Sequence, residues 1–172
     1  ASGATYIVGA NDTVASIAGA GNITLTANLT AGDSNSTTFS GVMSSTGSFT
    51  KVGAGTLTLS NANTYTGGTT ISAGSVVVSG SGTLGSTSNS LVMNNAAVLD
   101  LQKALTVASL VMTSANSIIN SAGSSSLVVS GTSTLAGSIT TSGSQTYTGA
   151  VQLGSDLTLT TANGAVLFSS TV

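Results

Sequence analysis

The chain has 172 residues, of which 40% are hydrophobic and only 3% are charged, and its net charge is −2 at pH 7. This hydrophobic content excludes a disordered chain, and the two basic residues are too few to neutralise the phosphates of a nucleic acid. No apolar run approaches the roughly 20 residues that cross a bilayer, and no basic start followed by an apolar stretch indicates a signal peptide.

Short runs in which apolar residues alternate with Thr or Ser predict β-strands, because alternation gives each strand one apolar and one hydroxyl face. In chain order these runs occupy residues 23–26, 56–59, 75–78, 97–101, 126–129 and 157–160. Residues 98–112 come closest to helical spacing, but their Val, Thr and Ser favour strand. Gly and Asn mark turns between the runs, at 19–21, 53–55, 67–68, 80–82, 94–95 and 163–164.

The spacing of these strands fits a sandwich, a barrel or a solenoid, and two observations favour the solenoid. The sequence Thr-Tyr-Thr-Gly at 64–67 recurs at 146–149, an offset of 82 residues or about four coils, and Thr5-Tyr6 is a fainter copy. Aromatic residues make up only 3% of the chain, which suits a narrow core of stacked aliphatic side chains. The sequence therefore predicts an all-β solenoid of 7 to 8 coils, about 20–25 residues each, in a rod roughly 35–40 Å long.

Residues 38–74 carry a specific pattern: a lysine at 51, Gly-Ala-Gly at 53–55, Thr-Leu-Thr-Leu at 56–59, Asn-Thr-Tyr-Thr-Gly-Gly-Thr at 63–69 and Ala-Gly at 73–74. This stretch resembles the autotransporter-associated β-strand repeat. Residues 95–101 look like a companion coil of the same proteins, although Lys103-Ala104 departs from the Gly/Asn-rich turn that is usual there.

Residues 143–171 are similar to repeats of giant filamentous-haemagglutinin-like adhesins. The two resemblances imply a right-handed parallel β-helix, export by a Gram-negative bacterium and a location at the cell surface or beyond it. We expect residues 1–172 to form a single β-solenoid segment. The chain starts and stops inside these patterns, so we also expect a piece of a longer protein or a unit that stacks on copies of itself.

Some right-handed β-helices are lyases or hydrolases, so a carbohydrate-active enzyme is an alternative. The positions of the four aspartates decide whether a catalytic pair of carboxylates is possible. Glycoside hydrolysis needs two carboxylates about 5–10 Å apart, and only Asp12 and Asp33 are close enough in sequence to lie on adjacent coils. Asp100 and Asp156 are isolated, and the chain has no Arg or His to bind or deprotonate a sugar acid. We predict surface or turn aspartates and no catalytic residue.

No cofactor or metal site is predicted either, because the chain has no His, no Cys and no clustered carboxylates. The serines lack a base that would activate them as nucleophiles. Lys51 and Lys103 could form isopeptide cross-links with Asn or Asp, but a solvated or turn-capping role is the stronger interpretation.

Three groups of residues could still bind a surface or carry a modification. Outward Thr pairs could match ice or a glycan if they stacked on consecutive coils, but their sequence spacing does not place them so; they are Thr24/Thr26, Thr56/Thr58 and Thr158/Thr160. Tyr6, Tyr65 and Tyr147 could stack on sugars in an exposed column, whereas packing at corners is the stronger interpretation. Glycosylation sequons occur at Asn11, Asn22, Asn28 and Asn35.

These observations predict a structural or adhesive segment of a secreted bacterial surface protein, acting as a rigid stalk. A self-assembling extracellular filament subunit is the alternative, because neither end shows a polar cap and exposed strand edges need partners. The expected partners are neighbouring repeats or further copies of the chain, and a host or environmental glycan or surface. No nucleic acid, membrane insertion or cofactor is expected.

Overall fold

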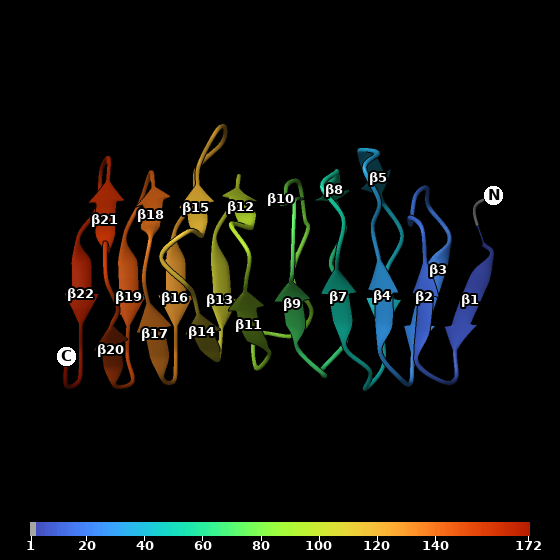
Figure 1. Ribbon diagram of the computed structural model, residues 1–172, viewed down its shortest axis with the longest axis horizontal. Coiled ribbons are helices and arrows are strands. Elements are labelled where there is room, and N and C mark those ends of the chain that lie inside the picture. The colour runs from blue at the N-terminus through green and yellow to red at the C-terminus, as the bar shows by residue number, and fades with distance from the viewer. Residues whose placement is uncertain (1–2) are drawn as a thin grey trace.

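The alternating apolar and hydroxyl-bearing residues form short strands in the computed structural model, which describes residues 3–172. Figure 1 shows the strands side by side along the long axis, with the two ends of the chain at opposite ends of the molecule. The strand pairs are parallel, and no helix occurs among residues 3–172. The predicted β-solenoid is confirmed, with about eight coils.

Each coil passes three faces in turn, and the faces are numbered here from the one that holds β2. The first face is an eight-stranded sheet of β2 (Asp12–Val14), β4 (Leu29–Ala31), β7 (Phe49–Lys51), β9 (Thr69–Ile71), β11 (Ser90–Met93), β14 (Ser109–Val111), β17 (Ser133–Leu135) and β20 (Val151–Leu153). The second face is a seven-stranded sheet of β5 (Thr37–Phe39), β8 (Thr56–Leu59), β10 (Ser75–Val78), β12 (Val98–Leu101), β15 (Ser117–Ile119), β18 (Ser138–Thr141) and β21 (Thr158–Thr161).

The third face is divided into two sheets. At the N-terminal end it holds β1 (Thr5–Val8), β3 (Asn22–Leu25) and β6 (Met43–Ser44). At the C-terminal end it holds β13 (Leu105–Val107), β16 (Leu127–Val129), β19 (Gln145–Tyr147) and β22 (Val166–Phe168). Between β6 and β13 two coils cross this face without a regular strand, and backbone hydrogen bonds such as Thr64 N to Met43 O (2.8 Å) and Ser86 N to Tyr65 O (2.9 Å) still join them to their neighbours.

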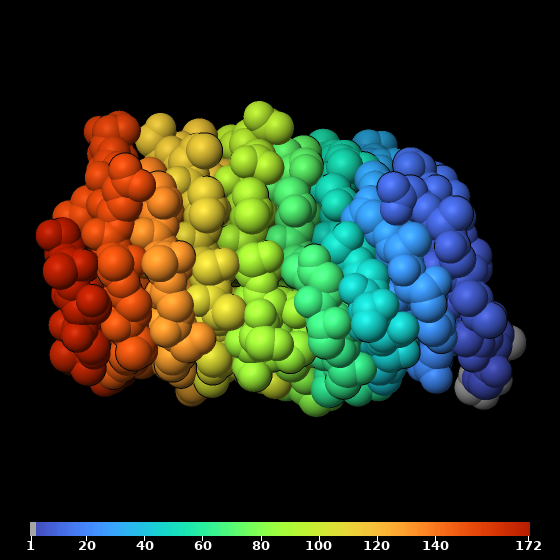
Figure 2. Space-filling model, turned by 90° about the horizontal axis from the view of Figure 1, so that it is seen from below, coloured from blue at the N-terminus to red at the C-terminus, as the bar shows by residue number. Residues whose placement is uncertain are grey.

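Coil length varies more than the sequence predicts. Thr5 pairs with Asn22, whereas Ser75 pairs with Val98, so the coil that starts at Thr5 is clearly the shorter of the two. It is also shorter than the coil length expected from the sequence. The stack remains continuous nevertheless, and the space-filling view shows the coils as successive bands along an elongated body (Figure 2).

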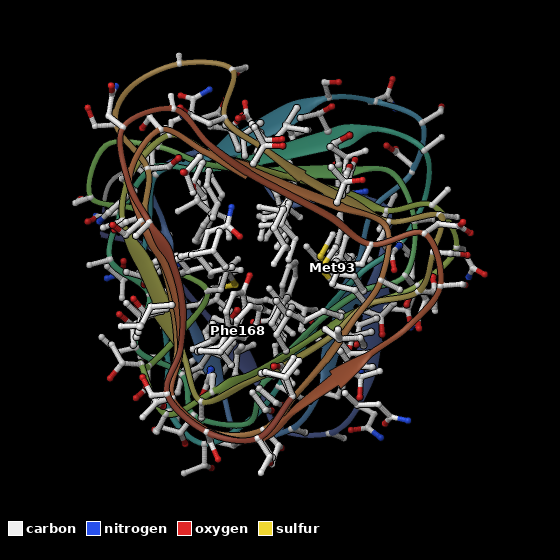
Figure 3. The ribbon with its side chains drawn as sticks, turned by 90° about the vertical axis from the view of Figure 1, so that its left-hand side faces the viewer. Met93 and Phe168 are labelled. Carbon is white, nitrogen blue, oxygen red and sulfur yellow. The ribbon has the colours of Figure 1, made fainter. Side chains whose placement is uncertain are left out.

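The core is a set of aliphatic columns that run through the coils. On the second face, in-register pairing stacks Leu57, Val76, Leu99, Ile118 and Ile139, and all five are buried. Burying such a side chain contributes about 1.5–3 kcal/mol to stability. This burial depends on contact with the neighbouring coils in the stack. Seen along the axis, the inward side chains fill the centre of the solenoid (Figure 3).

Candidate functional site

Residues 38–74 resemble the autotransporter-associated β-strand repeat. The residues that define this pattern are therefore the first candidates for function. The strands β7, β8, β9 and β10 carry most of this stretch, and their apolar residues alternate inward. Phe49 and Tyr65 meet edge to face inside the solenoid, with ring centroids 6.5 Å apart. Several residues of the pattern therefore point into the core.

Lys51 is the most unexpected of these residues, because its side chain points inward and is only 2% exposed. Its ammonium group donates to the carbonyl oxygens of Val52 at 2.6 Å, Gly53 at 2.9 Å and Ala73 at 3.4 Å. Burial lowers the pKa of Lys51, while the carboxylate of Asp33 acts in the opposite direction. The lysine thus joins turns of two consecutive coils, which confirms the turn-capping interpretation and excludes a solvated one.

A buried hydroxyl pair lies beside the part of the third face that has no regular strand. The hydroxyl groups of Tyr65 and Thr69 lie 2.6 Å apart, and Thr69 donates to Leu84 O at 3.1 Å. The side-chain amide of Asn89 donates to Tyr65 O at 2.8 Å. Two of these bonds engage backbone carbonyls, Leu84 O and Tyr65 O, in the coils that cross this face without a regular strand.

Asn63 links three successive coils at the same place. Its side-chain oxygen accepts from Met43 N at 2.9 Å, and its side-chain nitrogen donates to Thr83 O at 2.9 Å. The side chain is 2% exposed. Asn63 therefore acts as a substitute for strand pairing, a role that the alternation pattern could not reveal.

The second Thr-Tyr-Thr-Gly copy builds another internal contact. Tyr147 is fully buried, donates to Gln145 Oε1 at 3.1 Å and stacks on Phe168 with ring centroids 5.2 Å apart. Gln145 is also fully buried and donates to Ile139 O at 3.1 Å and Thr160 O at 2.9 Å. The two copies lie four coils apart on the third face, as the spacing of the repeated sequence predicts.

Of the three tyrosines, only Tyr6 is exposed, at 40%. It pairs with the buried Ile23 of the next coil. Its hydroxyl donates to Asp12. Because Tyr65 and Tyr147 are buried, the exposed sugar-stacking column is wrong and the packing interpretation holds for those two residues.

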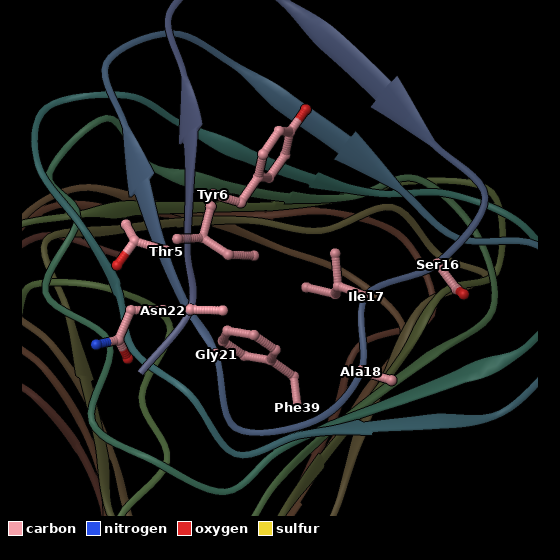
Figure 4. Close-up of a pocket in the computed structure, with 10 residues that line it drawn as sticks. Thr5, Tyr6, Ser16, Ile17, Ala18, Gly21, Asn22 and Phe39 are labelled. Atoms are coloured by element: carbon pink, nitrogen blue, oxygen red, sulfur yellow. The ribbon is translucent and has the colours of Figure 1, made fainter. Parts of the chain in front are cut away.

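Tyr6 lies beside an open pocket of about 350 Å³ at the N-terminal end of the core. The close-up in Figure 4 shows Tyr6, Ile17 and Phe39 among the residues that line it. Residues of the first two coils line this pocket, among them Ile17 of the first and Ile23 and Phe39 of the second.

The carboxylates are spread over different faces and turns. Asp12 begins β2 opposite Leu29, whereas Asp33 lies beyond the other end of β4, so these two carboxylates are separated by the length of a strand. The hydrogen bond from Tyr6 lowers the pKa of Asp12, and the backbone of Asn35 lowers the pKa of Asp33. No group of three or more metal-ligating side chains occurs among residues 3–172.

Asp100 is largely buried in β12 and is bound within the protein. Burial opposes its ionisation, but hydrogen bonds from the backbone and hydroxyl of Ser121 and from Gln102 outweigh burial and lower its pKa. Asp156 lies in an exposed turn with a positive φ of 58°, and Lys103 lies in the turn after β12.

The predicted Thr pairs lie far from one another. Thr24 is in β3 on the third face, whereas Thr56 and Thr58 are in β8 and Thr158 and Thr160 are in β21, at distant positions of the second face. The three pairs therefore do not stack on one another, because Thr24 and Thr56 lie on different faces and β8 and β21 are far apart on the second face.

A different threonine ladder does occupy consecutive coils. Thr13, Thr30, Thr50 and Thr70 pair in register along the first face. The side chain of Asn28 donates to Thr30 Oγ1 at 3.0 Å and accepts from Thr50 Oγ1 at 3.1 Å. The hydroxyls of Thr30 and Thr50 are thus engaged within the protein, which disfavours a ligand-matching face.

The four sequon asparagines lie on the first coils, and side chains among them take part in local bonds. Asn11 accepts from Asn28 N at 3.1 Å, and Asn22 accepts from Val42 N at 3.0 Å. Asn35 donates to Asp33 at 2.9 Å. The use of these sequons stays a prediction.

In the described part of the chain, no helix has the length and apolar character needed to cross a membrane.

Comparison with known families agrees with this structure. Residues 49–78 match the family model described as the passenger-associated-transport-repeat, which overlaps the predicted repeat at 38–74. Searches of curated proteins and of solved structures gave no match. The matched repeat and the β-solenoid together fit an autotransporter passenger repeat protein. The similarity of residues 143–171 to adhesin repeats stays a prediction.

Proposed function

We propose that this chain is a rigid structural segment of a secreted surface protein of a Gram-negative bacterium, and that it acts as a stalk. The observation that carries the proposal is the inward placement of the matched repeat. Lys51, Asn63 and Tyr65, which mark that repeat, are all buried and all bind neighbouring coils. Because these residues bind one coil to the next, the repeat pattern acts in the stability of the stack.

The physical properties of the stack suit this role. Parallel pairing and continuous apolar columns make each coil support the next one, so the rod resists bending and local unfolding. The chain offers trypsin only two lysines and no arginine, and one of the lysines is buried. Both features protect a passenger that is exposed to external proteases.

The proposal includes no enzymatic activity. Asp12 and Asp100 are bound by other side chains of the chain, and the sequence has no His or Arg to complete an acid–base pair. A net charge of −2 also gives no support for nucleic-acid or anionic-membrane binding.

The test places the chain between an outer-membrane anchor and a terminal fluorescent domain on the bacterial surface. We expect the fluorophore to be raised by about 35–40 Å, with a narrow height distribution. A Gly/Ser linker of equal length is the control and gives a broad distribution. Unchanged adhesion to host cells and glycan arrays supports a stalk, whereas saturable binding by the chain alone would show an adhesive segment instead.

A second candidate, a filament subunit, rests on the open pocket beside Tyr6 and Ile17. At the opposite end, Phe168 and Val166 of β22 are only half-buried. Stacking of the last coil of one copy on the first coil of another would cover both surfaces. Negative-stain electron microscopy over a range of concentrations tests this: filaments many times longer than about 40 Å support it, and short rods at every concentration refute it.

A further inference from the structure

Asn163-Gly164 is the one Asn-Gly sequence in the chain. It forms the exposed turn between β21 and β22. Asparagine is a chemically labile residue, and a following glycine has no Cβ to keep its backbone nitrogen away from the asparagine side chain. This turn therefore combines the reactive pair with access to water.

In the described part of the chain, hydrogen bonds hold the backbone of the turn but engage neither of the two groups that must react. Asn163 N donates to Ser142 O at 2.8 Å, and Gly164 O accepts from Thr161 Oγ1 at 2.7 Å. Within residues 3–172, no hydrogen bond engages the side chain of Asn163 or the N–H of Gly164. No hydrogen bond among the described residues thus has to break before these two groups can react.

The next most reactive sites are the asparagines followed by serine, and hydrogen bonds restrain their side chains. Asn35 donates to Asp33, Asn89 donates to Tyr65 O, and Asn120 donates to Leu101 O. Asn116 accepts from Thr113 N at 2.7 Å and is buried. The fold therefore sets Asn163 apart from them.

We propose that Asn163 is a site of spontaneous deamidation that acts on the last coil. The nitrogen of Gly164 loses its proton to hydroxide and attacks Cγ of Asn163. The new C–N bond forms as the Cγ–Nδ2 bond breaks, and ammonia leaves with a proton from water. The cyclic imide then takes up one water molecule and opens to aspartate or isoaspartate.

The product changes both charge and geometry. Asn163 borders a groove of about 350 Å³ whose other lining residues are all uncharged; they are Ser124, Ser125, Ser126, Ser142 and Gly143. Deamidation adds a carboxylate there. Gly164 approaches Ser144 so closely that a Cβ on it would lie 2.4 Å from Ser144 N, so the extra backbone atom of isoaspartate displaces the turn and loosens β22.

The experiment incubates the full chain at about pH 8.5 and about pH 5 and maps isoaspartate and deamidation by mass spectrometry of the tryptic peptide 104–172. This peptide holds Asn163 together with Asn116 and Asn120 as internal controls. We expect Asn163 to convert at least about tenfold faster than either control, and faster at the higher pH.

The variant Asn163→Gln is the matched control, because a glutamine would have to close a larger ring. Residue 163 is exposed, so the longer side chain meets no packing constraint. We expect it to keep the fold, measured by circular dichroism, and to lose the fast conversion. Conversion of Asn120 or Asn116 ahead of Asn163, no conversion of Asn163, or a fast phase that survives in Asn163→Gln would each overturn the proposal.

Discussion

The hydroxyl group of Tyr65 lies 2.6 Å from that of Thr69 in the interior of the solenoid, at the point where the third face has no strand. Because Thr69 already donates to Leu84 O, Tyr65 is the donor of this pair. Burial raises the pKa of Tyr65, so its hydroxyl stays protonated and able to donate.

Replacement of Tyr65 by phenylalanine removes this donor and leaves the ring in place. We expect the free energy of unfolding to fall by about 1 kcal/mol, the usual net contribution of a buried hydrogen bond. Urea denaturation followed by circular dichroism measures it. A Tyr65→Phe protein as stable as the parent chain would contradict a role for the buried pair.

The variant Lys51→Met tests the lysine that joins two turns. Methionine fills the space but cannot donate to Gly53 O or Ala73 O, so we expect a loss of about 2–3 kcal/mol, within the range for hydrogen bonds made by a charged group. Lys103→Met should stay within about 0.5 kcal/mol of the parent chain. A Lys51→Met protein as stable as the parent would show that the ammonium bonds do not hold the coils together.

Limited digestion with trypsin compares the accessibility of the two lysines in the parent chain. Lys103 lies in a half-exposed turn, whereas Lys51 is buried in β7. We expect the folded protein to be cut first after Lys103, and the urea-unfolded protein to be cut after both. Early cleavage after Lys51, identified by mass spectrometry, would be incompatible with its burial.

Asp100 gives the solenoid a predictable acid response. Its pKa is lower in the folded chain than the ordinary 3.8, so its stabilising contribution is present above that value and is lost as the pH falls through the folded-state pKa. Melting temperatures between about pH 6 and pH 2 should fall less steeply in Asp100→Asn than in the parent. Asp12 and Asp33 keep their own response in both proteins, and parallel pH curves would refute the assignment to Asp100.

The strands of the second face could be predicted from sequence, because Leu57 and Leu59, like Val76 and Val78, alternate with outward residues. The ladder from Thr13 to Thr70 could not, since the coils differ in length and the sequence does not show which threonines meet. Register depends on the turns between strands, and their lengths carry no periodic signal.

The internal polar residues were also beyond sequence reasoning. Lys51 and Gln145 are charged or polar residues of a kind that is usually exposed, and only the turns and coils around them supply their backbone partners. The one available signal was the lysine in the repeat pattern, for which a solvated or a turn-capping role was predicted but not burial. Asn63 gave no signal, because an asparagine between Ala62 and Thr64 reads as an ordinary turn residue.

The most direct test of a rigid stalk is the distance between its two ends along the first face. Thr13 and Gln152 lie at opposite ends of one outward column, joined by a series of in-register pairings from β2 to β20. The chain has no native cysteine, so spin labels on Thr13→Cys and Gln152→Cys report this distance alone.

Pulsed electron paramagnetic resonance should then give one narrow distribution centred near about 34 Å, from one spacing of about 4.8 Å for each pairing. The same labelled protein unfolded in denaturant is the reference. The long unfolded chain between the labels predicts a broad distance distribution around roughly 65 Å. A broad distribution in the native protein would contradict the rigid solenoid on which the proposed function rests.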